Sequence, residues 1–176
     1  MLYPPDTWRL LITDSADGAT NMAVDEAILL GVAAGDSPPT LRFYGWQPPC
    51  LSIGCHQSMQ EVDIEACRRD GVTWVRRPTG GRAILHTDEL TYSVIAPLSE
   101  PRVRGGVVES YRRLSRGLVT GLRCLGVDAV QANAQRGDVE DKSAACFDAP
   151  SHYEVTVRGK KLVGSAQVRR RGAVLQ

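Results

Sequence analysis

Apolar residues recur along the chain at two spacings, which predict strands in some segments and helices in others. Short apolar runs between proline, glycine and polar residues are typical of strands. We expect strands at Trp8–Ile12, Leu41–Tyr44, Cys50–Ile53, Val72–Arg76 and Leu90–Ala96. A closing hairpin is predicted from Tyr153–Val157 and Val163–Val168, with its turn at Arg158 and Gly159.

We expect helices at 22–33, Glu61–Arg69 and Val107–Leu125, and the last of these shows the three- and four-residue apolar spacing that is typical of helices. Thr20 or Asn21 is expected to cap the first of these helices, and Gly35 to end it. The longest helix places six apolar side chains on one face: Val107, Tyr111, Leu114, Leu118, Leu122 and Leu125. Helices interspersed with hairpin-rich strands predict an α/β (α+β) fold, in which helices pack on a mixed, largely antiparallel sheet.

Composition is that of one globular domain, which we expect to span residues 1–176, with 43% hydrophobic and 23% charged residues. A net charge of +1 gives no overall attraction to nucleic acid or to a membrane. The first residues lack the pattern of a signal peptide. Five cysteines without a C-x-x-C pair favour a reducing, cytoplasmic location. The chain stops at AVLQ, within an apolar run, so we expect its C-terminal part to be missing.

The densest group of polar and glycine residues is RRPTGGRAILH, residues 76–86. Paired glycines at Gly80 and Gly81 allow backbone N–H groups to approach a ligand closely. The segment matches neither G-x-x-x-x-G-K-[ST] nor G-x-G-x-x-G. On spacing alone, a hairpin loop with exposed arginines is slightly favoured over a binding loop.

Four blocks of sequence, in the order of a known family, favour the binding loop instead. RRPTGGRAILH with DELTYSV resembles the signature of the lipoate/biotin protein ligase superfamily. NMAVDEAIL and LRFYGWQPPCLSIGCHQ resemble the first helix and the next two strands of that superfamily, and CFDAPSHYEVTVRGKKLVGSAQVRR resembles its second half. The blocks extend from Asn21 to Gln176, and they are most similar to the octanoyltransferase branch. The resemblance implies the catalytic-domain fold of the superfamily.

Two residues receive catalytic roles from this resemblance. Ligases of the superfamily usually carry an Asn-Asp pair where this chain has Cys146 and Phe147. A thiol at that position suits acyl transfer, which implies that Cys146 is the nucleophile. Lys161 stands just before L-V-G-S-A, where the family places a lysine beside the cysteine, and a nearby ammonium favours the thiolate. Alternation along a strand then predicts that Lys160 faces solvent.

Substrate contacts are implied for Arg76, Arg77, Thr79, Gly80, Gly81, His86, Gly164, Ser165 and Ala166. His86 has two candidate roles: a general base, or a residue that lines the acyl pocket or holds the glycine loop. Cys50, Cys55 and His56 do not have a usual zinc spacing, so no metal is expected. Arg82 replaces the third glycine of lipoate ligases, which argues against an adenylate in the loop.

The resemblance implies an enzyme that takes octanoyl from acyl carrier protein as a cysteine thioester and passes it to a lysine of a lipoyl-domain protein, such as glycine-cleavage H protein. No cofactor is expected, because the acyl group arrives on the phosphopantetheine of the carrier. Arg112 and Arg113 are candidates for docking the acidic carrier. The alternatives are an amidotransferase variant, an ATP-dependent lipoate-protein ligase, or a non-catalytic acyl- or carrier-binding module of the same fold.

Overall fold

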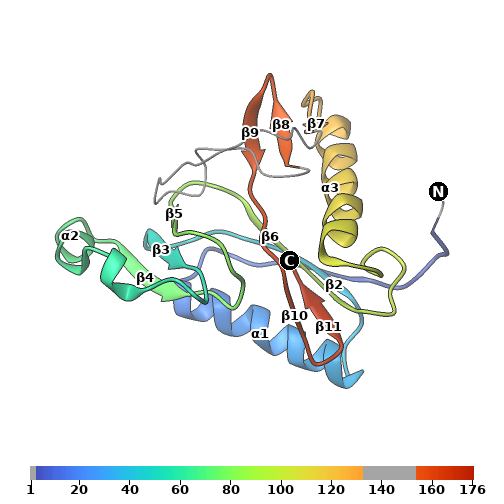
Figure 1. Ribbon diagram of the computed structural model, residues 1–176, viewed down its shortest axis with the longest axis horizontal. Coiled ribbons are helices and arrows are strands. Elements are labelled where there is room, and N and C mark those ends of the chain that lie inside the picture. Colours follow the sequence, from blue (N-terminus) through green and yellow to red (C-terminus); the bar gives the residue numbers. More distant parts are fainter. Residues whose placement is uncertain (1–2, 133–153) are drawn as a thin grey trace. The chain divides into compact units, whose positions relative to one another are not determined.

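The structure, a computed structural model, describes residues 3–132 and 154–176. Two units divide the chain: the first comprises Met1–Pro97 and Ala166–Gln176, and the second comprises Leu98–Ser165. Figure 1 shows their helices and strands, and each unit is described by itself below.

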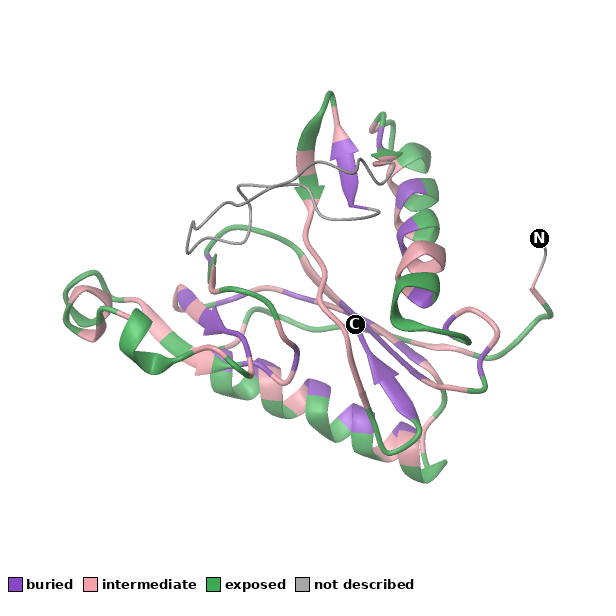
Figure 2. Ribbon diagram, viewed as in Figure 1, coloured by how far each residue is buried: buried purple, intermediate pink, exposed green. Residues whose placement is uncertain are grey.

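A five-stranded sheet forms the centre of the first unit, in the order β1-β2-β6-β11-β10. Its strands are β1 (Arg9–Ile12), β2 (Thr40–Tyr44), β6 (Thr91–Pro97), β10 (Val168–Arg170) and β11 (Ala173–Leu175). β1 and β2 are parallel, whereas the other neighbours pair antiparallel. β11 is buried along its whole length (Figure 2). The prediction of a mixed, largely antiparallel sheet is therefore confirmed.

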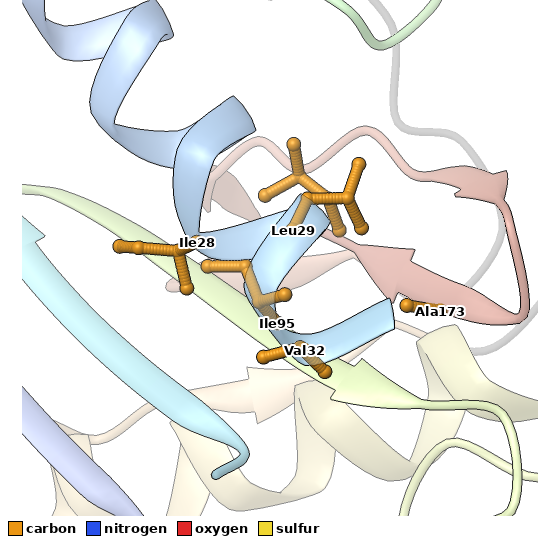
Figure 3. Close-up of a cluster of buried hydrophobic side chains, with 6 residues drawn as sticks. Ile28, Leu29, Val32, Ile95 and Ala173 are labelled. Atoms are coloured by element: carbon orange, nitrogen blue, oxygen red, sulfur yellow. The ribbon is translucent and has the colours of Figure 1, made fainter. Parts of the chain in front are cut away.

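Helix α1 (Gly18–Ala34) packs on this sheet through Ile28, Leu29 and Val32. Figure 3 shows these side chains beside Ile95 of β6 and Ala173 of β11. Burying each large aliphatic side chain stabilises the fold by about 1.5–3 kcal/mol, so this cluster fixes the helix to the sheet.

The start of α1 was predicted too late and with the wrong cap. Asp17 is the cap, because its carboxylate accepts a hydrogen bond from the backbone N–H of Thr20 at 2.9 Å. The Asn21 amide instead donates to the carbonyls of Ala16 and Gly45. The predicted end is confirmed, since Gly35 adopts a left-handed conformation with φ +83°.

A three-stranded sheet in the order β4-β3-β5 completes the first unit. Its strands are β3 (Cys50–Ile53), β4 (Thr73–Arg76) and β5 (Ile84–His86), the last of which the sequence pattern did not indicate. The helix predicted at Glu61–Arg69 is two elements, a 3-10 turn at Met59–Glu61 and α2 at Ile64–Arg69. Asp63 separates them because its side chain caps α2.

The second unit packs α3 (Val107–Cys124) against a sheet ordered β7-β8-β9. The strands are β7 (Val130–Gln131), β8 (Val155–Val157) and β9 (Lys160–Val163). Leu118 and Leu122 pack against the core as predicted, but Val107 and Leu125 at the two ends of the helix are 52% and 80% exposed.

The first strand and the turn of the closing hairpin lie where the sequence predicted them. The second strand was predicted to begin at Val163, three residues too late. Arg158 and Gly159 have φ angles of +50° and +77°, the geometry of a two-residue hairpin turn, so β9 begins at Lys160. Val168 belongs to β10, which forms a second hairpin with β11. Across residues 3–132 and 154–176, the structure contains no helix that is both long and apolar enough to cross a membrane.

Candidate functional site

The glycine loop runs from the end of β4 to the start of β5 and lies against the end of β3. Arg77 N–H donates to the Ile53 carbonyl at 3.0 Å, and Cys55 N–H donates to the Thr79 carbonyl at 3.0 Å. A Cβ atom on Gly54 would collide with the Gly81 carbonyl oxygen, so the two backbones touch here. Gly81 also has a φ angle of +92°, which residues with a Cβ rarely adopt.

Arg77 lies inside this loop and is 7% exposed. Its Nη2 donates to the carbonyls of Gly80 and Arg82 at 2.8 and 2.7 Å. Its Nη1 donates to the Ser52 carbonyl at 2.8 Å. Because these donors meet the carbonyls of the protein itself, Arg77 fixes the shape of the loop.

Arg76 has a different environment, on the exposed side of the strand end. Its Nη1 donates to the carbonyls of Gly54 and Gln57 at 2.8 and 2.7 Å. A hairpin loop with exposed arginines, the alternative favoured by spacing, therefore describes Arg76 but not the buried Arg77.

His86 is held on three sides. Its ring stacks on Trp46, with centroids 3.9 Å apart and planes at 9°. Its Nε2 lies 2.8 Å from Ser52 Oγ, and its Nδ1 lies 2.5 Å from Glu89 Oε1. Ser52 Oγ also accepts a hydrogen bond from Arg77 Nη1 at 3.1 Å.

These contacts assign the protons of the imidazole. Since Arg77 only donates, Ser52 Oγ accepts from it and has its own proton for His86 Nε2. His86 Nδ1 then carries the proton that is donated to Glu89. Burial lowers the pKa of His86, and Glu89 acts in the opposite direction, so the ring is neutral at pH 7.

A serine, a histidine and a glutamate in line resemble the triad of hydrolases, but the geometry here excludes that role. Ser52 is fully buried, and its oxygen already accepts a bond from Arg77. Because Nε2 of His86 is engaged by this serine, the arrangement favours the role of holding the glycine loop over that of general base. Ser52, Glu89 and Trp46 were not singled out from the sequence, although the short spacing from His86 to Glu89 is a local signal.

The second unit carries Lys161 on β9. Its Nζ lies 2.6 Å from Glu154 Oε1, and both side chains are nearly buried, at 8% and 3% exposure. Lys160 is exposed, which confirms the predicted alternation. The pairing register of β8 with β9 shifts between Val155 and Thr156, and Lys161 pairs with Thr156. Glu154 was not predicted, and it fixes the ammonium of Lys161 in place.

The remaining predicted residues are placed as follows. Thr79 is buried in the glycine loop, and Gly80 is half-buried. Gly164, Ser165 and Ala166 form a half-buried connection after β9, with Ala166 assigned to the first unit. Cys146 lies outside the described residues. Within the described ranges, no three His, Cys, Asp or Glu side chains are grouped so that they could hold a metal ion.

The fold and these two groups of residues agree with one family. The model of the lipoyl protein ligase A/B catalytic domain matches residues 17–176, and the chain belongs to this family. Among its relatives, the octanoyltransferase LipM of Moorella thermoacetica is 54% identical over 98% of the chain and 64% of that protein. The octanoyltransferase LipM of Kyrpidia tusciae is 57% identical over 97% of the chain and 64% of that protein. The chain thus spans less than two thirds of the length of these relatives.

Solved structures show the same fold in ligases. A putative lipoate protein ligase from Thermoplasma acidophilum, Ta0514, has a TM-score of 0.73 and 30% identity, covering 95% of this chain and 65% of that one. A lipoate-protein ligase A crystallised with ATP has a TM-score of 0.73 and 31% identity, covering 95% and 63%. These likenesses confirm the predicted catalytic-domain fold.

Proposed function

We propose that the chain is the catalytic part of an octanoyltransferase of lipoate biosynthesis. The observation that carries this proposal is the identity of 54% and 57%, over nearly the whole chain, to two proteins named octanoyltransferase LipM. Cys146 supports it, because a cysteine nucleophile distinguishes acyl transfer from the adenylate chemistry of ligases.

The reaction has two steps, each of which breaks one acyl bond and forms another. The Cys146 thiolate attacks the carbonyl carbon of an octanoyl thioester on acyl carrier protein, and the pantetheine sulfur leaves and takes up a proton. The amine of an acceptor lysine, on a lipoyl-domain protein such as glycine-cleavage H protein, then attacks the octanoyl-cysteine. An amide forms, the amine loses a proton, and the thiolate of Cys146 is regenerated. Because a thioester is converted into an amide, no nucleotide or other cofactor is required.

Lys161 and the glycine loop have separate roles in this proposal. The Lys161 ammonium, held by Glu154 at 2.6 Å, favours the cysteine thiolate and exchanges the proton with the leaving and attacking groups. Backbone N–H groups near Gly80 and Gly81, or at Phe147, are the candidate donors to the tetrahedral oxyanion, and Arg77 keeps the glycine loop in shape. The four described cysteines are free thiols, which fits work in the reducing cytoplasm.

The test is transfer to an acceptor without ATP. Octanoyl carrier protein and a lipoyl-domain acceptor are mixed with the enzyme that contains this chain, and octanoyl-lysine is measured. We expect transfer that Cys146→Ala abolishes and that Cys55→Ala, a change at a half-buried free cysteine, leaves intact. Transfer that persists in Cys146→Ala would contradict the proposal.

A second candidate is an ATP-dependent lipoate ligase, which the ligase with bound ATP at 31% identity favours. A ligase of this kind would catalyse the exchange of labelled pyrophosphate into ATP in the presence of lipoate. We expect no such exchange, because the Asn-Asp pair of ligases is replaced by Cys146 and Phe147.

A further inference from the structure

The second unit contains a hollow of about 590 Å³ between the loop after α3 and the β8–β9 hairpin. Its apolar lining includes Val127, Val157 and Leu162. Arg158 and Lys160 also line it, and Asp128 is the one acidic residue among the described residues of its lining. The hollow therefore combines an apolar surface with an excess of positive charge.

Arg158 and Lys160 are available to a ligand. Both are exposed, and no hydrogen bond or ion pair engages either side chain within residues 3–132 and 154–176. Lys161 also lines the hollow, but its Nζ pairs with Glu154. Two unengaged cations on one hairpin suit a partner that presents anions at this surface.

Arg158 occupies a backbone conformation that an arginine seldom adopts. Its φ angle of +50° at the first turn position favours asparagine or glycine. Arg171 has the same geometry, with a φ angle of +51° and Gly172 after it, in a turn of the first unit, and it is not among the residues that line this hollow. The turn geometry alone is therefore not specific, and Arg171 serves as a matched control.

Exposed apolar side chains extend the surface around the hollow. Leu162 in its lining is 46% exposed, and Leu125, which precedes the lining residue Gly126, is 80% exposed. Exposed leucines beside unengaged cations are typical of a surface that binds a partner with both acidic and apolar residues.

The arginines expected from the sequence to dock the carrier are less suitable. Arg113 donates to Glu109 Oε1 at 2.7 Å and to the Arg104 carbonyl, so its guanidinium is already engaged. The Nε of Arg112 is buried. Arg113 is thus paired with a carboxylate, and both arginines are half-buried, whereas Arg158 and Lys160 are exposed.

We propose that the basic hollow docks the acyl carrier protein, whose acidic surface and pantetheine phosphodiester meet Arg158 and Lys160. This inference rests on the proposed octanoyltransferase function. The acyl carrier protein always presents the negatively charged phosphodiester of its pantetheine group. The acceptor protein instead presents a lysine, which Arg158 and Lys160 repel. Lys161, the candidate catalytic lysine, is among the residues that line the hollow, so a carrier held here lies at the hairpin that bears it.

The experiment compares two octanoyl donors in loading Cys146. One is octanoyl carrier protein, and the other is octanoyl-N-acetylcysteamine, which has neither protein nor phosphate. For Arg158→Glu with Lys160→Glu, we expect kcat/KM for the carrier to fall about tenfold, with a weaker dependence on salt. The small donor should react at the wild-type rate. Arg171→Glu repeats the charge reversal in the matched turn and should leave both rates unchanged.

A second variant and a binding measurement guard against misfolding. Arg158→Gly removes the charge while relieving the positive φ, so it should fold normally and still bind the non-acylated carrier more weakly in fluorescence anisotropy. Loading by the carrier at the wild-type rate in the double variant would overturn the inference. An equal loss with both donors, or a defect confined to transfer onto the acceptor, would also overturn it. Failure of the wild-type enzyme with both donors would instead refute the octanoyltransferase function itself.

Discussion

Arg77→Met tests whether one buried guanidinium holds the glycine loop. The change removes the hydrogen bonds from Nη1 to the Ser52 carbonyl and hydroxyl and from Nη2 to the carbonyls of Gly80 and Arg82. Water can reach the half-buried Gly80 and the exposed Arg82, but Ser52 is fully buried. Leaving buried acceptors unsatisfied costs about 1–3 kcal/mol each, so we expect the free energy of unfolding to fall by about 3 kcal/mol.

Arg76→Met is the matched control, since it changes the preceding arginine in the same way. Arg76 is exposed, and water can replace its bonds to Gly54 and Gln57, so we expect a loss of about 1 kcal/mol or less.

The assay is urea unfolding followed by tryptophan fluorescence. All three tryptophans of the chain lie in the first unit, so the signal reports the unit that contains the loop. A loss for Arg77→Met no larger than that for Arg76→Met would refute the argument that Arg77 fixes the loop.

Three further predictions concern the first unit. Asp25→Ala should lower the free energy of unfolding by about 3–5 kcal/mol in urea titrations, because it leaves Arg42, 1% exposed, without the carboxylate 2.9 Å away. Gly54→Ala should lower it by about 1–3 kcal/mol, since the added Cβ meets the Gly81 carbonyl oxygen. Burial lowers the pKa of His86 below its ordinary 6.5, so its neutral form is the one that the fold accepts. The contribution of His86 to the free energy of unfolding is therefore complete above pH 6.5 and is lost as the pH falls through the pKa of the folded state. His86→Gln should not show this loss when the free energy of unfolding is measured in urea at pH values from 7 downwards.

The sequence predicted those helices and strands whose defining residues lie within a few positions of one another. β1 and β2 follow from short apolar runs between turn residues, the end of α1 follows from Gly35, and the exposure of Lys160 follows from alternation along β9. The start of α1 was missed because Asp17 caps the helix from outside the apolar run.

The side-chain networks depend on residues that fold together from distant positions. Ser52 and His86 are 34 positions apart, and only the pairing of β3 with β5 brings them to 2.8 Å. The burial of Arg77 also depends on distant residues, because the glycine loop folds back over the end of β3. Alternation of apolar and polar residues does not predict such a fold. The Glu154–Lys161 ion pair depends on the register of β8 with β9, which was not predicted from the sequence, and the second strand of that hairpin was placed three residues too late.

The central claim is that the acyl group passes through Cys146, and intact-protein mass spectrometry after mixing the enzyme with octanoyl carrier protein tests it most directly. We expect one octanoyl adduct that hydroxylamine removes, that forms without ATP and that is absent from Cys146→Ala. A folded enzyme that shows no adduct, or an adduct that persists in Cys146→Ala, would contradict the account.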